Sequence, residues 1–307
     1  MSDQHPLWAA VDIGANSVRL LLARPQPGPT LQVVRNVDSL TALGEGVAET
    51  GRILPQSLRR TAEVVAAYVE EARQAGAAEI WCLGCDAFRE ARNGDKARAQ
   101  IEAGAGVPLR VLSGQEEAEL TFWGAILGLE DLPEPFAVVD IGGGAAKFAL
   151  GSREGPERTV TLPLGARKLT EECVWHDPPT EQDCAAVRQI AREAVLGSAA
   201  AEVLRQAVTL VGSGGSMIVL RDLAQERGLE GPTVPGEMVC EILRWLAEMN
   251  VAQRRLALGH HARRAEIICA GLACIAELLQ LSELPEFRVS EGGLRHGLLF
   301  LEARRRA

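Results

Sequence analysis

One sequence motif occurs twice in this chain of 307 residues, and the repeat constrains the fold more than any other feature. Asp12-Ile-Gly-Ala15 follows an apolar run near the N-terminus, and Asp140-Ile-Gly-Gly143 follows another one 128 residues later (140 minus 12). In both places a second apolar run comes directly after the small residues, which is the pattern of a β-hairpin with a tight turn. The repeat therefore predicts two copies of one domain type, and we expect a cleft between them.

The rest of the chain alternates helical and strand patterns, which is typical of an α/β fold with sheets covered by helices. Helices are predicted at residues 55–76, 95–103, 115–127, 236–249, 264–281 and 293–304, and strands at 79–83, 109–112, 207–211 and 287–290. Residues 127–135 have the proline and charge content of a connector. We therefore assign residues 1–127 to an N-terminal α/β domain and 128–307 to a C-terminal α/β domain. Whether the last helix packs on the N-terminal domain is left open.

Composition excludes several classes of protein. A net charge of −9 and an aromatic content of 4% argue against a nucleic-acid or anionic-membrane partner. The apolar runs are too short to cross a membrane, and the N-terminus lacks the basic segment of a leader peptide. The seven scattered cysteines fit a reducing compartment, and Cys82 and Cys85 are interpreted as structural thiols. We expect a cytoplasmic protein, and we interpret His260 and His261 as solvated surface.

Three glycine-rich turns follow predicted strands, at residues 14–17, 142–144 and 212–216. Glycine lets the backbone come close to a ligand and direct several N–H groups at it, and phosphate is the usual ligand. For any one turn, a tight bend without a ligand is an equally good interpretation. Three such turns in one chain favour phosphate binding.

Asp12 and Asp140 each lie where a strand is predicted to end. A carboxylate in that position can hold Mg²⁺ or orient a water molecule, and its alternative role is to accept hydrogen bonds from the N–H groups of the turn. Because the two aspartates occur in matched contexts, we favour metal ligands.

Two further sets of charged residues follow strands. Glu116 and Glu117 fall in the first turn of a predicted helix, where acids also complement the helix dipole. Adjacent helical residues point about 100° apart, so at most one of the two can face a given site, and composition does not tell which. Arg89 lies in a strand-to-helix loop, where a guanidinium suits either phosphate oxygens or a surface ion pair.

Eight segments together resemble the exopolyphosphatase/guanosine pentaphosphate phosphohydrolase family, in its short two-domain form. They are Asp12-Ile-Gly-Ala-Asn-Ser17, Leu43-Gly-Glu-Gly46, Arg89-Glu-Ala91 with Asn93, Ser113-Gly-Gln-Glu-Glu-Ala118, Asp140-Ile-Gly-Gly-Gly144, Leu162-Pro-Leu-Gly165, Gly212-Ser-Gly-Gly-Ser216 and Ser290-Glu-Gly-Gly-Leu-Arg295. The family belongs to the acetate kinase/sugar kinase/heat-shock ATPase/actin superfamily. The resemblance covers nearly the whole chain and implies two actin-like ATPase (ribonuclease H-like) domains.

The resemblance also implies a reaction, the hydrolysis of a terminal phosphoanhydride in polyphosphate or guanosine pentaphosphate. Glu117 matches the family's general base, Arg89 its phosphate-binding arginine, and Asp140 its Mg²⁺-site carboxylate; Asp12 is our second candidate for the metal. The candidate substrate-binding residues are Gly14, Ala15, Asn16, Ser17, Arg89, Gly142, Gly143, Gly144, Lys147, Gly214, Gly215 and Ser216.

The second loop departs from the family pattern. It continues Ala145-Ala146-Lys147 where Ser-Thr-Glu is usual, so an acid that helps to hold the metal is replaced by a cation. Lys147 could supply positive charge in place of part of the metal. The alternative is a weakly active or inactive relative that binds polyphosphate or an alarmone as a sensor. A homodimer is one of the assemblies that we consider.

Overall fold

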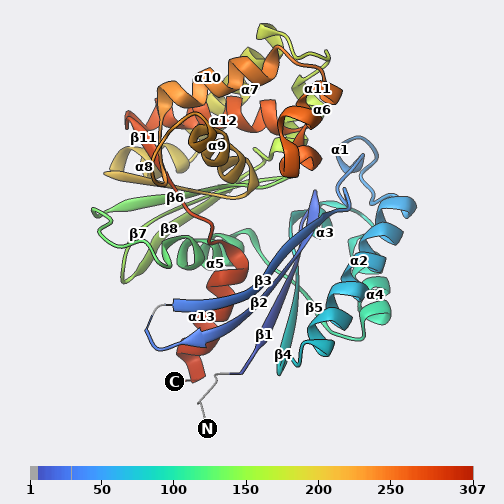
Figure 1. Cartoon of the computed structure of the whole chain (residues 1–307). Helices are drawn as coiled ribbons and strands as arrows, with labels where there is room; N and C mark the ends of the chain where they lie inside the picture. Colours follow the sequence, from blue (N-terminus) through green and yellow to red (C-terminus); the bar gives the residue numbers. More distant parts are fainter. Residues whose placement is uncertain (1–5, 29, 307) are drawn as a thin grey trace. The chain divides into compact units, whose positions relative to one another are not determined.

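The computed structural model describes residues 6–28 and 30–306, and it divides the chain into two units (Figure 1). The first unit contains the residues up to Gly128 and those from Gly292 onwards; the second is Leu129–Glu291. The start of the chain, where we expected no leader peptide, lies partly outside the described residues. None of the helices in the described ranges is both long and apolar enough to cross a membrane.

The first unit is built on a five-stranded sheet in the order β3-β2-β1-β4-β5. Its strands are β1 (Trp8–Ile13), β2 (Ser17–Gln26), β3 (Thr30–Leu40), β4 (Glu79–Gly84) and β5 (Leu109–Val111). β1 and β2 form the first predicted hairpin, with Asp12 paired to Arg19, and β4 and β5 add on in parallel. The first hairpin prediction is thus confirmed.

Helices cover both faces of this sheet. They are α1 (Val47–Thr50), α2 (Pro55–Gln74), α3 (Asp86–Glu90), α4 (Gly94–Ala105), α5 (Gly114–Ile126) and α13 (Leu294–Arg306). Alternate side chains of β1 point to opposite faces, as the two-residue period of a strand requires. Ala9, Val11 and Ile13 pack into the cluster formed with α2 and α4. Trp8 and Ala10, on the other face, pack with Leu298 and Leu299 of α13.

The last helix belongs to the first unit. We expected residues 128–307 in the second domain and left this helix open; the structure groups the residues from 292 onwards with the first unit, because α13 packs on α5 (Figure 1). The two helices approach through glycines. A Cβ atom on Gly297 would lie 1.8 Å from the Leu120 carbonyl oxygen, and one on Gly124 would lie 1.9 Å from the Gly293 carbonyl oxygen. No side chain fits at either position.

The second unit repeats the strand order of the first and adds one edge strand. Its strands are β6 (Phe136–Ile141), β7 (Ala146–Ser152), β8 (Gly155–Leu162), β9 (Thr209–Ser213), β10 (Thr233–Pro235) and β11 (Glu286–Val289). The order is β10-β11-β9-β6-β7-β8. β6 and β7 form the second predicted hairpin, and β9 and β11 occupy the places of β4 and β5. The two copies expected from the repeated motif are therefore present.

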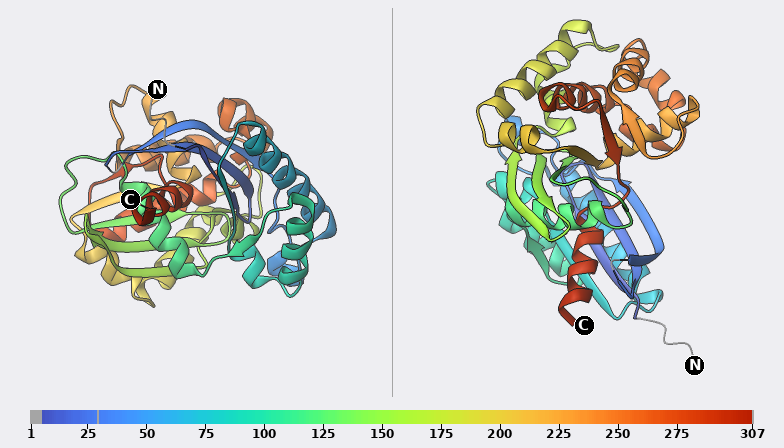
Figure 2. Two further views of the ribbon diagram at one scale, coloured as in Figure 1. Left: turned by 90° about the horizontal axis from the view of Figure 1, so that it is seen from below. Right: turned by 90° about the vertical axis from the view of Figure 1, so that its left-hand side faces the viewer.

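The helices of the second unit surround one buried helix. They are α6 (Ala166–Cys173), α7 (Glu181–Leu196), α8 (Ala200–Gln206), α9 (Gly215–Glu226), α10 (Gly236–Ala247), α11 (Val251–Ala257), the 3₁₀ helix η1 (Gly259–Arg264) and α12 (Ile268–Ser282). α12 is apolar on nearly all sides and buried along its length, as expected for a helix packed on several neighbours. The right-hand view of Figure 2 shows it between α7 and α10, which it contacts.

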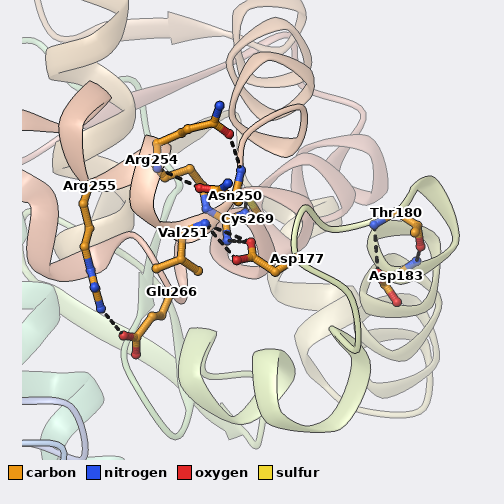
Figure 3. Close-up of polar contacts among 10 residues, drawn as sticks. Asp177, Thr180, Asp183, Asn250, Val251, Arg254, Arg255, Glu266 and Cys269 are labelled. Atoms are coloured by element: carbon orange, nitrogen blue, oxygen red, sulfur yellow. Dashed lines mark hydrogen bonds and ion pairs between the residues drawn. The ribbon is translucent and has the colours of Figure 1, made fainter.

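A buried arginine ties α11 to its neighbours (Figure 3). The Arg254 guanidinium donates to the Asp177 carboxylate (3.1 Å) and to the Cys269 sulfur (3.1 Å), while the Val251 N–H also donates to Asp177 (2.9 Å). A buried charge needs such partners, because desolvation alone would destabilise it. The cluster therefore fixes the segment before α7 against α11 and α12.

Candidate functional site

The first candidate turn connects β1 and β2. It consists of Gly14, Ala15 and Asn16 and is followed by Ser17, the first residue of β2. The Gly14 N–H donates to the Ser17 carbonyl (3.1 Å) and closes the hairpin. The carbonyl groups of Ala15 and Asn16 accept hydrogen bonds from the N–H groups of residues 44 and 42 (2.8 and 2.9 Å). These bonds hold the turn in one conformation.

Asp12 lies buried at the end of β1, two residues before this turn. Its Oδ1 accepts a hydrogen bond from the Cys85 thiol (3.2 Å), and Arg19 lies directly opposite on β2. Cys82, the other half of the CxxC pattern, is buried in β4, and burial raises the pKa of its thiol to about 12. A thiol with so high a pKa is not a thiolate near neutral pH, which fits the structural role that we expected.

The two neighbouring glutamates at the start of α5 have different roles. Glu116 completes a capping box with Ser113: the Ser113 Oγ accepts from the Glu116 N–H (3.1 Å), and the Glu116 carboxylate accepts from the Ser113 N–H (2.8 Å). The hydrogen bonds from Ser113 lower the pKa of Glu116, and Arg110 forms an ion pair with it. Glu117, about 100° further round the helix, is fully buried. The structure thus selects Glu117 as the glutamate that faces inward.

Glu117 forms an ion pair with Arg89 of α3. The same guanidinium also donates to the carbonyl oxygen of Leu112, immediately before the cap of α5. Burial lowers the pKa of Arg89, but the Glu117 carboxylate outweighs that effect, so the pKa of Arg89 is raised above its usual value. The candidate general base and the candidate phosphate-binding arginine are therefore in direct contact, a pairing that sequence patterns did not indicate.

The second candidate turn, Gly142–Gly144, connects β6 and β7. The carbonyl of Gly142 accepts from the Ala166 N–H (2.9 Å), and that of Gly143 accepts from the Arg167 N–H (3.0 Å), both at the start of α6. The carbonyl groups of Gly142 and Gly143 are thus engaged by α6, whereas backbone N–H groups of the loop are not used in these bonds. Among the described residues, none accepts a hydrogen bond from the N–H of Gly143 or of Gly144. Two backbone donors in this turn are thus available to an anion.

Asp140 and the third candidate turn are in contact. The Asp140 Oδ1 accepts a hydrogen bond from the Ser213 hydroxyl (3.0 Å) at the end of β9. Gly214 follows with a φ of +89°, and a Cβ atom on it would lie 2.5 Å from that same Oδ1. The glycine is therefore required twice, by its backbone conformation and by the approach of the carboxylate.

The start of α9 is in contact with Arg264, the last residue of η1, which sequence reasoning missed. The guanidinium of Arg264 lies against Gly215, where a Cβ atom would fall 1.8 Å from its Cζ. Ser216, the next candidate, is buried in α9, and its hydroxyl faces Gly271 of α12. Arg264 lies 49 residues after Gly215 (264 minus 215) in a segment with no motif, so only the tertiary structure reveals it.

Each hairpin pairs its aspartate with a cation. Lys147 is directly opposite Asp140 on β7, as Arg19 is directly opposite Asp12 on β2. Directly opposite residues project on the same face of a sheet, and opposite charges stabilise such a pair. Lys147 is buried, and its Nζ lies 3.4 Å from the position that a Cβ on Gly142 would take, so its charge is beside the second turn.

The aspartates could hold a metal only together with other ligands. Within the part of the chain that the structure describes, neither Asp12 nor Asp140 belongs to a group of three His, Cys, Asp or Glu side chains close enough to share one ion. Mg²⁺ is commonly bound through one or two carboxylates, with waters and substrate phosphates completing the shell. Asp12 and Asp140 each have a second carboxylate oxygen besides the hydrogen-bonded Oδ1. One carboxylate oxygen from the protein fits the coordination of Mg²⁺.

Comparisons with known proteins show the family of the chain. The Ppx/GppA phosphatase family matches residues 21–306. The protein named exopolyphosphatase 2 of Mycobacterium tuberculosis is 33% identical over 308 residues, which covers 94% of this chain and 96% of the relative. A solved Ppx/GppA family member of Aquifex aeolicus is 26% identical and has a TM-score of 0.78, with 98% of both chains covered.

A further solved structure supports the fold alone. An exopolyphosphatase from Cytophaga hutchinsonii is 20% identical and has a TM-score of 0.88, with 97% of this chain and 98% of the other covered. Two α/β units with the same strand order, each led by a hairpin, are those of the actin-like ATPase fold, as the resemblance implied. The chain belongs to the Ppx/GppA phosphatase family.

Proposed function

We propose that this protein hydrolyses the terminal phosphoanhydride bond of inorganic polyphosphate and releases phosphate, with guanosine pentaphosphate as a second substrate. The observation that carries the proposal is the buried carboxylate of Glu117, held by Arg89 at the start of α5. The family and the names of the relatives support polyphosphate as the substrate.

Glu117 is the proposed general base. A water molecule attacks the terminal phosphorus in line with the bridging oxygen, and its proton passes to the Glu117 carboxylate. The bond between the phosphorus and the bridging oxygen breaks, and its electron pair leaves with the oxygen of the shortened chain. Such a reaction needs positioning and charge neutralisation more than covalent chemistry from the protein. A fixed carboxylate and several anion-binding groups meet those needs.

Arg89 has two proposed partners. Without substrate its guanidinium binds Glu117, and with substrate it also binds an oxygen of the terminal phosphate. A guanidinium binds phosphate oxygens in the same planar geometry as it binds a carboxylate. Arg89 would thereby set the distance between the base and the phosphorus, which is the kind of positioning on which effective molarity depends.

The glycine-rich turns are the proposed phosphate-binding groups of both units. The substrate-binding residues are Gly14, Ala15, Asn16, Ser17, Gly142, Gly143, Gly144, Gly214, Gly215 and Ser216, together with Arg89 and Lys147. The free N–H groups of Gly143 and Gly144 support this role most directly. The charge of Lys147 beside the same turn would add to the attraction of an anion.

Mg²⁺ is the proposed cofactor. Asp140 would hold it, with Asp12 as the second candidate, and each has one carboxylate oxygen beyond the hydrogen-bonded Oδ1. When bound, Mg²⁺ would neutralise part of the phosphate charge. Lys147 opposite Asp140 competes for that carboxylate, so we expect a weaker dependence on the metal than an acid at this position would give.

A polyphosphate or alarmone sensor is the second candidate function. The cation at position 147 favours it, because it stands where the family pattern has an acid that helps to hold the metal. In that case the turns bind the polyanion, and Glu117 remains engaged with Arg89 without turnover.

The experiment measures phosphate release from long-chain polyphosphate and, separately, from guanosine pentaphosphate, with and without Mg²⁺. Binding of each substrate is measured in parallel by calorimetry. Release from polyphosphate supports the hydrolase, and the ratio of the two rates identifies the preferred substrate. Tight binding without release from either substrate favours the sensor. Neither binding nor release contradicts both functions.

A further inference from the structure

Two adjacent histidines and an aspartate converge in the second unit. Asp222 is in α9, whereas His260 and His261 are in η1. The Asp222 Oδ2 lies 2.7 Å from Nε2 of His261 and 3.8 Å from Nε2 of His260, and one ligand atom from each of the three residues lies within 4.8 Å of the others. We expected both histidines on the solvated surface; that is wrong for His261, whose side chain is only 16% exposed.

The carboxylate of Asp222 is oriented by hydrogen bonds to the oxygen that does not face the histidines. Its other oxygen, Oδ1, accepts hydrogen bonds from Nε (2.9 Å) and Nη2 (2.6 Å) of Arg221. Arg221 is in turn bound by Glu291, whose Oε1 lies 2.8 Å from Nη1. An outer partner on one carboxylate oxygen, with the second oxygen directed at two imidazoles, is the arrangement that orients ligands in metal sites.

The two imidazoles are suited to bind a cation. Their ring centroids are 3.8 Å apart, so the two rings are in contact with each other. Imidazole nitrogens are common ligands of transition metals, and a cation can take the place of the proton between His261 Nε2 and Asp222 Oδ2.

We propose that Asp222, His260 and His261 bind a borderline divalent transition-metal ion, with Zn²⁺ as its representative. Zinc is bound by imidazole nitrogen and carboxylate oxygen at about 2.0–2.2 Å, so its tetrahedral ligands are about 3.3 Å apart. The two separations from Asp222, 2.7 and 3.8 Å, lie on either side of that value, and all three ligand atoms lie within 4.8 Å of one another. Imidazole ligands select zinc, nickel or copper over magnesium, which distinguishes this site from the proposed Mg²⁺ site.

Positive charges beside the site limit its affinity and connect it to α9. Arg221 is shared between two carboxylates, so its charge is compensated. Arg264, at the end of η1, repels positive charge at His261, and its guanidinium lies against Gly215. A bound ion would join η1 to α9, whose N-terminus is the third candidate phosphate turn.

The test uses the full chain and titrates it with ZnCl₂ in a calorimeter, in the presence of excess Mg²⁺. We expect one ion per chain, and we expect His260→Ala and Asp222→Asn each to weaken binding by at least about 10-fold. The His260 side chain is 74% exposed, so its removal leaves the fold intact. Cobalt(II) provides a second readout, because a four-coordinate site gives strong visible absorption that the same variants should lose.

The matched control is His176→Ala. His176 is also paired with an aspartate, Asp183 (3.0 Å), but that pair belongs to no three-residue cluster in the described part of the chain. The control should bind zinc as the wild type does. The proposal is overturned if the wild type binds no zinc, if His260→Ala and Asp222→Asn bind it unchanged, if Mg²⁺ displaces it, or if His176→Ala loses it equally. Each of these outcomes is independent of phosphate release, so it leaves the proposed hydrolase activity untouched.

Discussion

The guanidinium of Arg89 is bound to the carboxylate of Glu117. The two residues that the family pattern assigns to phosphate binding and to base catalysis therefore form an ion pair. Glu117 is fully buried, and Arg89 also holds the carbonyl of Leu112 at the start of the same helix. A change at either residue therefore affects both the stability of the first unit and the geometry of the proposed base.

Removing the charge of Arg89 should destabilise the protein as well as inactivate it. Arg89→Gln removes the ion pair between Arg89 and the buried Glu117 carboxylate, and removing one partner of such a pair costs about 3 kcal/mol. Chemical denaturation measures the loss. Arg92→Gln is the control, because Arg92 is exposed and three residues further on; it should change the free energy of unfolding by less than about 0.5 kcal/mol. Equal effects of the two substitutions would show that the ion pair contributes nothing.

The close approach of α13 to α5 predicts a strong effect from one methyl group. A Cβ atom on Gly297 would lie 1.8 Å from the Leu120 carbonyl oxygen, so Gly297→Ala must push the two helices apart. We expect a loss of at least about 2 kcal/mol in the free energy of unfolding. Gly104→Ala in α4 is the matched control, since no atom lies within 4 Å of its Cβ position. It should stabilise the protein by up to about 1 kcal/mol, because alanine is the better helix former. Similar thermal denaturation curves for the two variants would contradict the packing described for α13.

Replacing Gly214 by alanine is expected to destabilise the protein by more than its positive φ alone would cause. Gly228 has nearly the same φ, +91° against +89°, but open space around its Cβ position, whereas that of Gly214 meets the Asp140 carboxylate. Gly228→Ala should therefore cost only backbone strain, about 1 kcal/mol. Gly214→Ala should cost more and should also lower phosphate release, because it displaces Asp140. If both variants lost the same free energy of unfolding and Gly214→Ala kept full activity, Asp140 and its turn would have no role in phosphate release.

The stability of the protein should fall as the pH falls below about 6.5. Burial, with repulsion from Arg295, lowers the pKa of His296 to about 3, while an unfolded histidine has a pKa of about 6.5. Between these values the unfolded chain binds a proton that the folded chain does not, so stability is complete above pH 6.5 and is lost as the pH falls. The loss is about 1.4 kcal/mol per pH unit.

The measurement is chemical denaturation at several pH values between about 5.5 and 7, where carboxylates contribute little to the slope. His296→Leu should reduce the slope. Part of it should remain, because burial lowers the pKa of His261 in the same direction. A variant with the wild-type slope would mean that His296 is accessible to protons in the folded chain.

Sequence patterns predicted the parts of the fold that local chemistry determines. The apolar runs around Asp12 and Asp140 gave both hairpins, and the repeated motif anticipated two sheets of one strand order. β3 was not predicted, because it is mostly exposed and its side chains do not alternate between apolar and polar. The position of α13 was left open, since its packing on α5 depends on two glycines far apart in the chain.

The sequence predicted which residues are candidates for the site, but it did not predict which of them are in contact. Helix geometry limited the candidates to one of Glu116 and Glu117, the family resemblance implied Glu117, and the capping box of Glu116 and the burial of Glu117 agree with that choice. The ion pair of Arg89 with Glu117 and the approach of Arg264 to Gly215 join residues 28 and 49 positions apart (117 minus 89 and 264 minus 215). No spacing rule reaches across such distances, so both contacts needed the tertiary structure.

Comparing Glu117→Gln with Glu116→Gln tests whether Glu117 is the general base. The substitutions are the same and the positions adjacent, but Glu116 caps the helix, whereas Glu117 is the proposed base. Initial rates of phosphate release from long-chain polyphosphate are measured for both variants, with thermal denaturation confirming that each is folded. We expect Glu117→Gln to lose about 100-fold to 10,000-fold in rate, as removal of a general base does, while Glu116→Gln stays within a few-fold of the wild type. A folded Glu117→Gln variant that releases phosphate at the wild-type rate would contradict the account.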